Sequence, residues 1–290
     1  MTLEQLRIFV AVAEREHVTR AAEALHMTQS AVSGTIAALE ARHGVALFNR
    51  VGRGIELTEA GRLFLDEARA VLARAAHAEA LLADLAGLAR GTLHLVASQT
   101  IASYWLPQRL ATFTAEYPQI AIELSIDNSE GAAARVREGK AELGFVEGMI
   151  DEPALVQRAV ARDAVALIGA ASIAHIDAQW LRAARWIMRE RGSGTRSTFE
   201  EMIRAHGLDP AELDCAMTLP SNEAVLTAVE TGAGVAMLSR QVVARAAETG
   251  RIAILPVTLP DRPFHLIRHS ERRLTRAADA LIHVLEEYPA

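Results

Sequence analysis

Polar side chains at two places in this sequence have the types and spacing to bind a ligand through hydrogen bonds. The first place is residues 18–43, where amide and hydroxyl groups share one face of an expected helix: Gln29, Ser30, Ser33 and Thr35. The opposite face is apolar, because Val32, Ile36 and Leu39 recur at spacings of four and three residues. Glutamine can pair with adenine through two hydrogen bonds, and serine adapts to several partners. The polar face therefore predicts contacts in a DNA major groove.

The elements that must position this face are two short helices joined by a tight turn. The first helix is expected over residues 19–25, the turn over residues 26–28, and the second helix from about residue 29 to residue 42. Ala21 and Ala22 are small enough to let the two helices cross closely. A helix pair with a polar second helix is the helix-turn-helix arrangement. The alternative interpretation is a helical hairpin inside some helical core.

A small β-hairpin is expected after this helix pair. Gly52 and Gly54 favour a turn, and apolar and polar residues alternate behind it over residues 55–57. This hairpin would be the wing of a winged helix, and it carries Arg50 and Arg53. Arginines on a wing commonly contact the phosphate backbone or the minor groove, although two solvated arginines are the alternative.

A long helix is predicted from residue 59 to about residue 89, with Thr58 as its N-cap. Its apolar residues recur at alternating spacings of four and three: Phe64, Ala68, Val71, Ala75, Ala78, Leu82 and Leu85. This is the heptad seam of a coiled coil, and its alanines allow two helices to approach closely. The seam predicts a homodimer, since two half-site readers on palindromic DNA also require one. The alternative is a helix that packs on its own domain.

The composition places limits on the class of protein. The formal net charge is −6, but the first 58 residues balance six arginines with six glutamates, so the N-terminal segment is not acidic. The one cysteine, Cys215, excludes an internal disulfide and a cysteine-based zinc cluster. The N-terminus does not read as a signal peptide and no apolar run has the length of a membrane span, so we expect a cytoplasmic protein without membrane contact.

Residues from about 92 onward alternate between strand and helix patterns. Strands are expected at residues 93–97, 120–126, 143–146, 165–168, 186–189, 235–238, 252–255 and 264–267, with an amphipathic helix over residues 274–287. Such alternation predicts an α/β region of two subdomains. The whole chain is therefore expected to combine an α-helical N-terminal part with an α/β C-terminal part.

The first 60 residues resemble the DNA-binding domain of the LysR-type transcriptional regulators. The resemblance is carried by LRIFVAVAE, TRAAEALHMTQSAVSGTIAALEARHGVALFNR and LTEAG. It extends along the chain through SQTIASYWLP, REGKAELGFVEG and RERGSGTR, which are similar to the branch that includes carbon-fixation and sulfur-metabolism regulators. Gly34 departs from the pattern, since many relatives have a long polar or basic side chain there, and Arg191 stands where many have proline.

This resemblance implies three parts. They are a winged helix-turn-helix over residues 1–58, a dimerising linker helix over residues 59–90, and an effector domain over residues 91–290 that is built like a type 2 periplasmic binding protein. The effector domain would divide into subdomain I, about 91–162 and 266–290, and subdomain II, about 163–265. The residues implied in DNA contact are Thr19, Thr28, Gln29, Ser30, Ser33, Arg50 and Arg53.

The second place with ligand-binding chemistry is the set of strand ends in the α/β region. Polar groups follow the strands there, and binding-protein folds hold ligands between two subdomains at strand ends and helix N-termini. The effector-binding residues that we predict are Ser98, Gln99, Thr100, Asn128, Glu147, Gly148, Thr195, Arg196 and Asn222. Their donors favour a small anion, whereas Glu147 would then need a proton or a cationic partner. The alternative for Ser129, Ser221 and Thr198 is a simple N-cap.

These features together predict a transcriptional regulator rather than an enzyme. No GxSxG elbow, P-loop or pair of histidines at metal-ligand spacing occurs, so we predict no catalytic residue, no metal site and no cofactor. The other-class alternative is an enzyme or a solute-binding transport protein. The expected partners are promoter DNA, a small effector and further copies of the chain, as a homodimer and then a homotetramer, with RNA polymerase as an additional partner.

The wing arginines give a first testable prediction. Arg53→Ala should weaken DNA binding across all sequences and flatten its dependence on salt, because a lost phosphate contact releases fewer counterions. The measurement is the slope of log K against log salt concentration in a titration of labelled promoter DNA. An unchanged slope would contradict a phosphate contact at Arg53.

Overall fold

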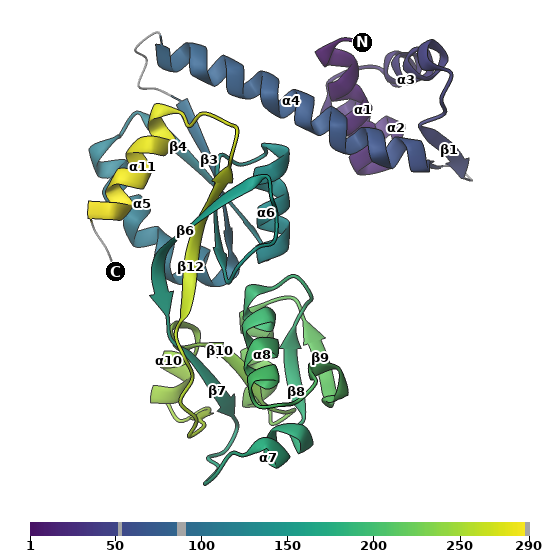
Figure 1. Ribbon diagram of the computed structural model, residues 1–290. Helices are drawn as coiled ribbons and strands as arrows, with labels where there is room; N and C mark the ends of the chain where they lie inside the picture. Colours follow the sequence, from purple (N-terminus) through teal and green to yellow (C-terminus); the bar gives the residue numbers. More distant parts are fainter. Residues whose placement is uncertain (52–53, 86–90, 288–290) are drawn as a thin grey trace. The chain divides into compact units, whose positions relative to one another are not determined.

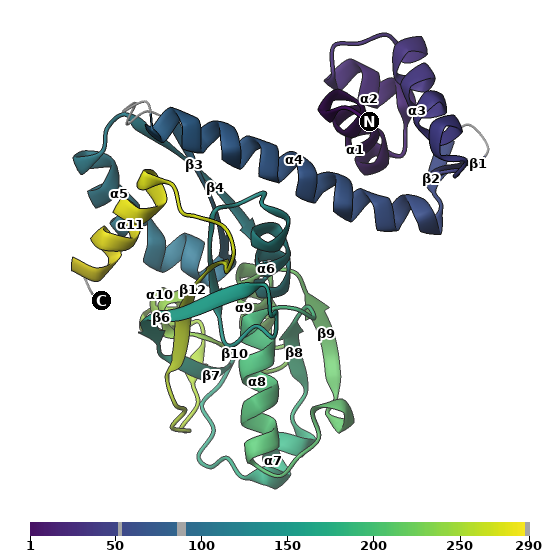
Figure 2. The same ribbon diagram turned by 45° about the horizontal axis from the view of Figure 1, so that its top comes forward.

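The protein forms two compact units in a computed structural model, residues 1–86 and residues 87–290. The structure describes residues 1–51, 54–85 and 91–287. Figures 1 and 2 show an all-helical N-terminal unit with a small hairpin and a C-terminal unit made of two α/β lobes. The predicted combination of an α-helical part with an α/β part is therefore confirmed. Each unit is described below by itself.

Three helices form the core of the first unit: α1 (Leu3–Arg15), α2 (Val18–Ala24) and α3 (Gln29–His43). Helix α1 begins with a capping box between Thr2 and Gln5. Its apolar face includes Phe9, which is fully buried and lies against the rings of Phe48 and Phe64. Phe48 belongs to the hairpin that follows α3, and Phe64 belongs to the long helix α4 (Glu59–Leu85). The short elements of this unit therefore share one core.

The turn between α2 and α3 depends on one unusual backbone conformation. His26 has a φ of +53°, and the amide of Met27 donates to the carbonyl oxygen of Ala22. A side chain in this left-handed region costs free energy, which the packing around the turn must offset. Thr28 then caps α3, because its hydroxyl oxygen accepts a hydrogen bond from the amide of Ala31. The predicted helix-turn-helix is thus present with its expected turn.

The hairpin consists of β1 (Phe48–Val51) and β2 (Gly54–Leu57), paired antiparallel. It is fixed to α3 through Glu40, whose carboxylate accepts hydrogen bonds from the amides of Leu47 and Phe48. A buried or half-buried carboxylate that receives two amide hydrogen bonds is held strongly. The orientation of the hairpin therefore follows that of α3.

Helix α4 (Glu59–Leu85) begins at Thr58, whose hydroxyl accepts a hydrogen bond from the amide of Gly61. Its first turns pack on α1, with Ala68 buried and Arg69 paired to Glu14 at 2.9 Å. Farther along the expected seam the side chains are open in the single chain: Val71 is 42% exposed and Leu82 is 68% exposed. The side chain of Leu85 lies outside the described residues. One end of the helix is thus built into its own domain, and the other presents apolar residues outward.

The first lobe of the second unit is a five-stranded sheet with the order β4-β3-β5-β12-β6. The strands are β3 (Gly91–Ser98), β4 (Ile120–Asp127), β5 (Leu143–Glu147), β6 (Leu155–Asp163) and β12 (Arg262–His269). The helices of this lobe are a π-helical turn (Ile101–Trp105), α5 (Leu106–Glu116), α6 (Ser129–Glu138) and α11 (Arg276–Glu287). Strands β3, β4 and β5 are parallel, so their carboxyl ends meet at one edge of the sheet.

The second lobe has strands β7 (Val165–Gly169), β8 (Trp186–Arg189), β9 (Cys215–Leu219), β10 (Ala236–Ser239) and β11 (Ala253–Ile254). Its helices are α7 (Ala178–Ala183), α8 (Gly194–Ala205), a 3-10 turn (Pro210–Glu212), α9 (Asn222–Glu230) and α10 (Arg240–Glu248). Strand β8 pairs with β9 and is joined to β10 through Val235, which links the two small sheets of this lobe.

Two chain crossings connect the lobes, from β6 to β7 and from β11 to β12 (Figure 1). The two long strands at the crossings are neighbours, and Arg262 at the start of β12 pairs with Asp163 at the end of β6. Arg262 therefore lies on the sheet of the first lobe. The family resemblance places the return of the chain to this subdomain at about residue 266, four residues later. The crossing point is therefore a short, two-stranded hinge.

The exposed half of α4 leads to a prediction about assembly. Leu82→Asp should dissociate a dimer, because a charge buried in a coiled-coil seam is unfavourable, while the fold of the single chain should tolerate it. The measurement is sedimentation equilibrium of the full chain. Ala76→Asp is the matched control, since Ala76 is also exposed on α4 but lies off the seam. Equal dissociation of both variants, or of neither, would contradict dimerisation through this seam.

Candidate functional site

The polar face predicted for the second helix is exposed on α3. Gln29, Ser30 and Ser33 are all exposed, and the apolar face of Val32, Ile36 and Leu39 is buried in the core. Thr28 is exposed as well, although its hydroxyl is used for capping and lies 3.1 Å from that of Ser30. Thr19 is half-buried on α2. The face is free in the single chain and offers donors and acceptors at the N-terminus of a helix, where phosphates also bind favourably.

The hairpin contributes one described arginine to this unit. Arg50 is exposed on β1, opposite Ile55, while Arg53 lies outside the described residues. Gly34 is exposed on α3, and a Cβ added there would meet no atom within 4 Å. The helix thus has room for the longer side chain that the family pattern suggests at this position.

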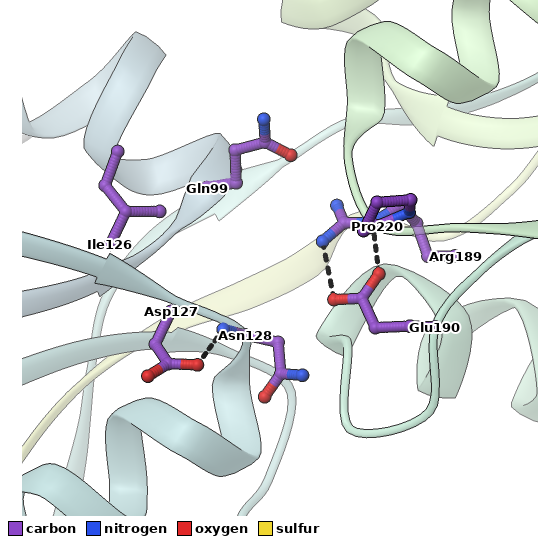
Figure 3. A pocket seen from close by; sticks show the side chains of 7 residues that line it. All are labelled: Gln99, Ile126, Asp127, Asn128, Arg189, Glu190 and Pro220. Carbon is purple, nitrogen blue, oxygen red and sulfur yellow. Dashed lines mark hydrogen bonds and ion pairs between the residues drawn. The ribbon is translucent and has the colours of Figure 1, made fainter. Parts of the chain in front are cut away.

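The second unit has a cleft of about 250 Å³ between its lobes, shown in Figure 3. It is lined from the first lobe by Gln99, Ile126, Asp127 and Asn128, and from the second lobe by Arg189, Glu190 and Pro220. Polar groups from both lobes therefore face one space at strand ends, where α/β folds commonly bind ligands.

Gln99 and Asn128 are the predicted effector residues that line this cleft. Gln99 accepts a hydrogen bond from the amide of Asn222 at 2.8 Å and donates to the carboxylate of Glu223. Asn128 caps α6, and its amide nitrogen donates to the carbonyl oxygen of Arg191 at 3.3 Å. Both side chains thus bond across the cleft as well as facing it.

Four other predicted residues lie at the strand and helix ends of the two lobes, and two of them form a bond that joins the lobes. Thr100 is 1% exposed and accepts a hydrogen bond from the side chain of Asn222, which is fully buried. Ser98 is buried at the end of β3, and its hydroxyl has no hydrogen-bond partner among the described residues. Gly148 follows β5 with a φ of +74°. The lobes are therefore held together directly at the ends of β3 and α9.

Glu147 has the cationic partner that its position requires. It is buried at the end of β5, accepts a hydrogen bond from Ser129 at 2.9 Å, and lies 3.6 Å from the guanidinium of Arg262. Arg262 also pairs with buried Asp163 at 2.8 Å and donates to the hydroxyl of Thr195 at 3.0 Å. We call this set of five residues the hinge network. Glu147 and Thr195 take part in it and are not among the residues that line the cleft.

Close approach of α8 to the first lobe explains two glycines in the GSGTR part of the RERGSGTR motif. A Cβ at Gly194 would lie 2.7 Å from atoms of Glu147 and Ser129. Gly192 has a φ of +82°, and its carbonyl oxygen accepts a hydrogen bond from the amide of Glu130. The loop therefore brings the backbone against the opposite lobe. Arg196 points to its own lobe, where it pairs with Glu200 and the carbonyl oxygen of Arg189.

Arg189 and Glu190 are cleft residues that the sequence interpretation missed. Arg189 is the last residue of β8, and its side chain is 5% exposed. Its guanidinium makes two hydrogen bonds to the carboxylate of Glu190, at 2.8 and 2.9 Å, and a third to Asn222 at 2.6 Å. The sequence did contain an indication of this, because Arg189 ends an otherwise apolar strand. A buried arginine is costly unless it has a partner.

Tyr104 and His265, two titratable groups of the first lobe, have shifted pKa values. Burial raises the pKa of Tyr104, and the neighbouring carboxylate of Glu223 raises it further. Burial lowers the pKa of His265 on β12, against a smaller opposite effect of its hydrogen bond to the backbone of Gly148. Both shifts favour the neutral form. These two side chains are therefore uncharged at neutral pH.

Profiles of two protein families match the chain. The bacterial regulatory helix-turn-helix protein of the lysR family matches residues 3–62, and the LysR substrate binding domain matches residues 86–290. The chain belongs to the LysR family. It is therefore a DNA-binding transcriptional regulator with an effector-binding domain, and the family to which it belongs consists of regulators rather than enzymes.

Several relatives resemble this LysR regulator along nearly its whole length. The HTH-type transcriptional regulator CfxR of Cupriavidus necator is 34% identical over 100% of this chain and 92% of its own. The uncharacterized HTH-type transcriptional regulator YeiE of Escherichia coli K12 is 33% identical over 96% and 94%. The HTH-type transcriptional regulator CbbR of Rhodospirillum rubrum is 32% identical over 98% and 95%.

Solved structures support the fold of the LysR regulator. The crystal structure of CbnR, a LysR family transcriptional regulator, has a TM-score of 0.72 at 22% identity and covers 99% of both chains. Full-length CbnR complexed with its target DNA has a TM-score of 0.71 at 23% identity, again over 99% of both chains. Within the described residues, no helix is long and apolar enough to cross a membrane, and no cluster of potential metal ligands occurs.

The hinge network gives a prediction about stability. Arg262→Gln should lower the free energy of unfolding by about 3–5 kcal/mol, because two buried carboxylates would lose their shared cation. The measurement is urea denaturation of the full LysR regulator. Arg204→Gln is the control, since Arg204 pairs with Glu200 on the surface and should change stability by less than about 1 kcal/mol. A similar small change for both variants would contradict the role of the network.

Proposed function

We propose that a small anion in the interlobe cleft controls promoter binding or DNA bending by this LysR regulator. The observation that carries the proposal is the cleft, in which Arg189 is the cation among the lining residues and faces Gln99 and Asn128 from the other lobe. A ligand that contacts both lobes favours one angle between them. It can shift the protein only by binding that arrangement more tightly than the others.

The DNA-binding residues remain the predicted set: Thr19, Thr28, Gln29, Ser30, Ser33, Arg50 and Arg53. Support comes from the exposed polar face of α3 and from Arg50 on the hairpin. We propose the division of the chain into residues 1–58, 59–90 and 91–290, with α4 as the dimerising element. Two dimers joined through their effector domains would form a tetramer that binds spaced half-sites in the cytoplasm and bends the DNA between them, in reach of RNA polymerase.

The names of the relatives suggest where to look for target promoters. A relative in Allochromatium vinosum, 32% identical over 97% of this chain and 94% of its own, is named RuBisCO operon transcriptional regulator. We propose promoters of carbon-fixation operons as the first DNA to test. The similarly related YeiE carries no such name, so promoters upstream of other metabolic genes belong in the same experiment.

The test is a footprint on promoter fragments with the full chain, with and without small anions. A ligand-controlled regulator should give footprints that differ in length or in hypersensitive positions at the bend. Thermal unfolding of the same samples identifies which anions bind, because a ligand of the native state raises Tm. Specific DNA binding that is identical with every stabilising anion would contradict control by the cleft.

A further inference from the structure

Arg189 has hydrogen-bonding capacity that its contacts within the protein do not use. A guanidinium carries five N–H donors. The bonds to Glu190 use one on Nε and one on Nη2, and the bond to Asn222 uses one on Nη1. Two N–H groups therefore remain on a side chain that is almost fully buried and lines the cleft. A buried N–H without a partner is costly, so this guanidinium is prepared to bind an acidic group.

Two carboxylates, those of Glu190 and Asp127, line the same cleft as Arg189. Glu190 is bound to the guanidinium of Arg189 with 27% of its side chain exposed, and Asp127 lines the same cleft from the first lobe (Figure 3). Asp127 is paired with Arg135 at 2.9 Å. Glu190 is paired with Arg189, and both of these side chains line the cleft. A bare anion on Arg189 would be repelled by Glu190, but a ligand hydroxyl could donate a hydrogen bond to either carboxylate.

We infer that the effector is a small hydroxylated acid whose acidic group binds the two remaining N–H donors of Arg189, and that Glu190 selects for its hydroxyl groups. The inference rests on the proposed function and adds the anchoring residue, the selecting residue and the chemical class of the ligand. The negative charge of Glu190 repels the acidic group of the ligand. A hydrogen bond from a ligand hydroxyl to Glu190 offsets this repulsion. Simple anions bind more weakly for this reason.

The volume of the cleft limits the size of such a ligand. Ile126 and Pro220 line the cleft beside the polar groups, and its volume of about 250 Å³ suits an acid of a few carbon atoms. Gln99 also lines the cleft from the first lobe, and its amide nitrogen has a second N–H beyond the one that it donates to Glu223. An acid that reaches from Arg189 to Gln99 and Asp127 contacts both lobes, so the same bonds that give selectivity also favour one lobe angle.

The experiment is calorimetric titration of the full-length protein with three matched pairs of acids. They are tartrate against succinate, glycerate against propionate, and glycerol 3-phosphate against inorganic phosphate. The wild type should bind the hydroxylated member of a pair more tightly. Arg189→Gln should weaken that binding about tenfold or more, since charged hydrogen bonds are lost. Glu190→Gln should tighten binding of the plain acid and reduce the preference for the hydroxylated one.

Arg137→Gln and Glu152→Gln are the charge-matched controls. Arg137 and Glu152 pair with each other at 2.9 Å outside the residues that line the cleft, so both variants should bind as the wild type does. If Arg189→Gln unfolds, Glu190→Gln still decides the matter, because its expected effect is a gain for the plain acid. Arg189→Lys, which keeps the charge, should retain part of the affinity.

Two results would overturn the inference while leaving the proposed function intact: binding of acids that is equal in Arg189→Gln and Arg137→Gln, or an unaltered preference in Glu190→Gln. Binding of the plain acids in preference to the hydroxylated ones would also overturn it. If no acid of the three pairs binds the wild type, the inference fails together with the proposal of a small anionic effector.

Discussion

A buried arginine shared by two buried carboxylates is the interaction on which the effector domain depends. Arg262 is 2.8 Å from Asp163 and 3.6 Å from Glu147, and each of these three side chains is at most 3% exposed. Charges in such surroundings are tolerated only with good partners, because removal from water is costly. The hinge network therefore fixes the place where β6 and β12 leave the first lobe.

The hinge network also connects elements that bear the cleft. Thr195 lies in the first turn of α8 in the second lobe, where it bonds to Arg262, and Ser129 begins α6 in the first lobe, where it bonds to Glu147. Asp163 accepts a further hydrogen bond from Ser239 at the end of β10. Since these bonds are directional, a change of lobe angle must alter several of them together. Interfaces of this kind favour discrete arrangements rather than continuous bending, which is what a ligand-controlled switch needs.

The N-terminal unit presents the polar face of α3 without a network of buried charges among its described residues. Its polar face is presented by local capping and by a small aliphatic and aromatic core, and the carboxylate of Glu40 ties the hairpin to the recognition helix. These bonds fix the position of the hairpin relative to α3. In the proposed dimer, the exposed half of α4 would set the separation of two such units on DNA.

Periodicity and turn chemistry in the sequence determined the elements. The spacing of Val32, Ile36 and Leu39 predicts α3 and its buried face, and Thr58 marks the start of α4, because helix faces and caps depend on residues a few positions apart. Polar residues at strand ends likewise indicated a cleft and included Gln99 and Asn128. The family pattern added the order of the parts.

Only the tertiary structure decided which polar groups share a space. Arg262 and Asp163 are 99 residues apart, and Gln99 and Glu223 are 124 apart, so no local pattern could pair them. The same folding drew Glu147 and Thr195 into the hinge network and brought Arg189 and Glu190 to the cleft wall, where the sequence had marked Arg189 merely as the end of a strand. The type of a residue determines which bonds it can make. Contacts between segments that are distant in the sequence determine which partner it bonds to.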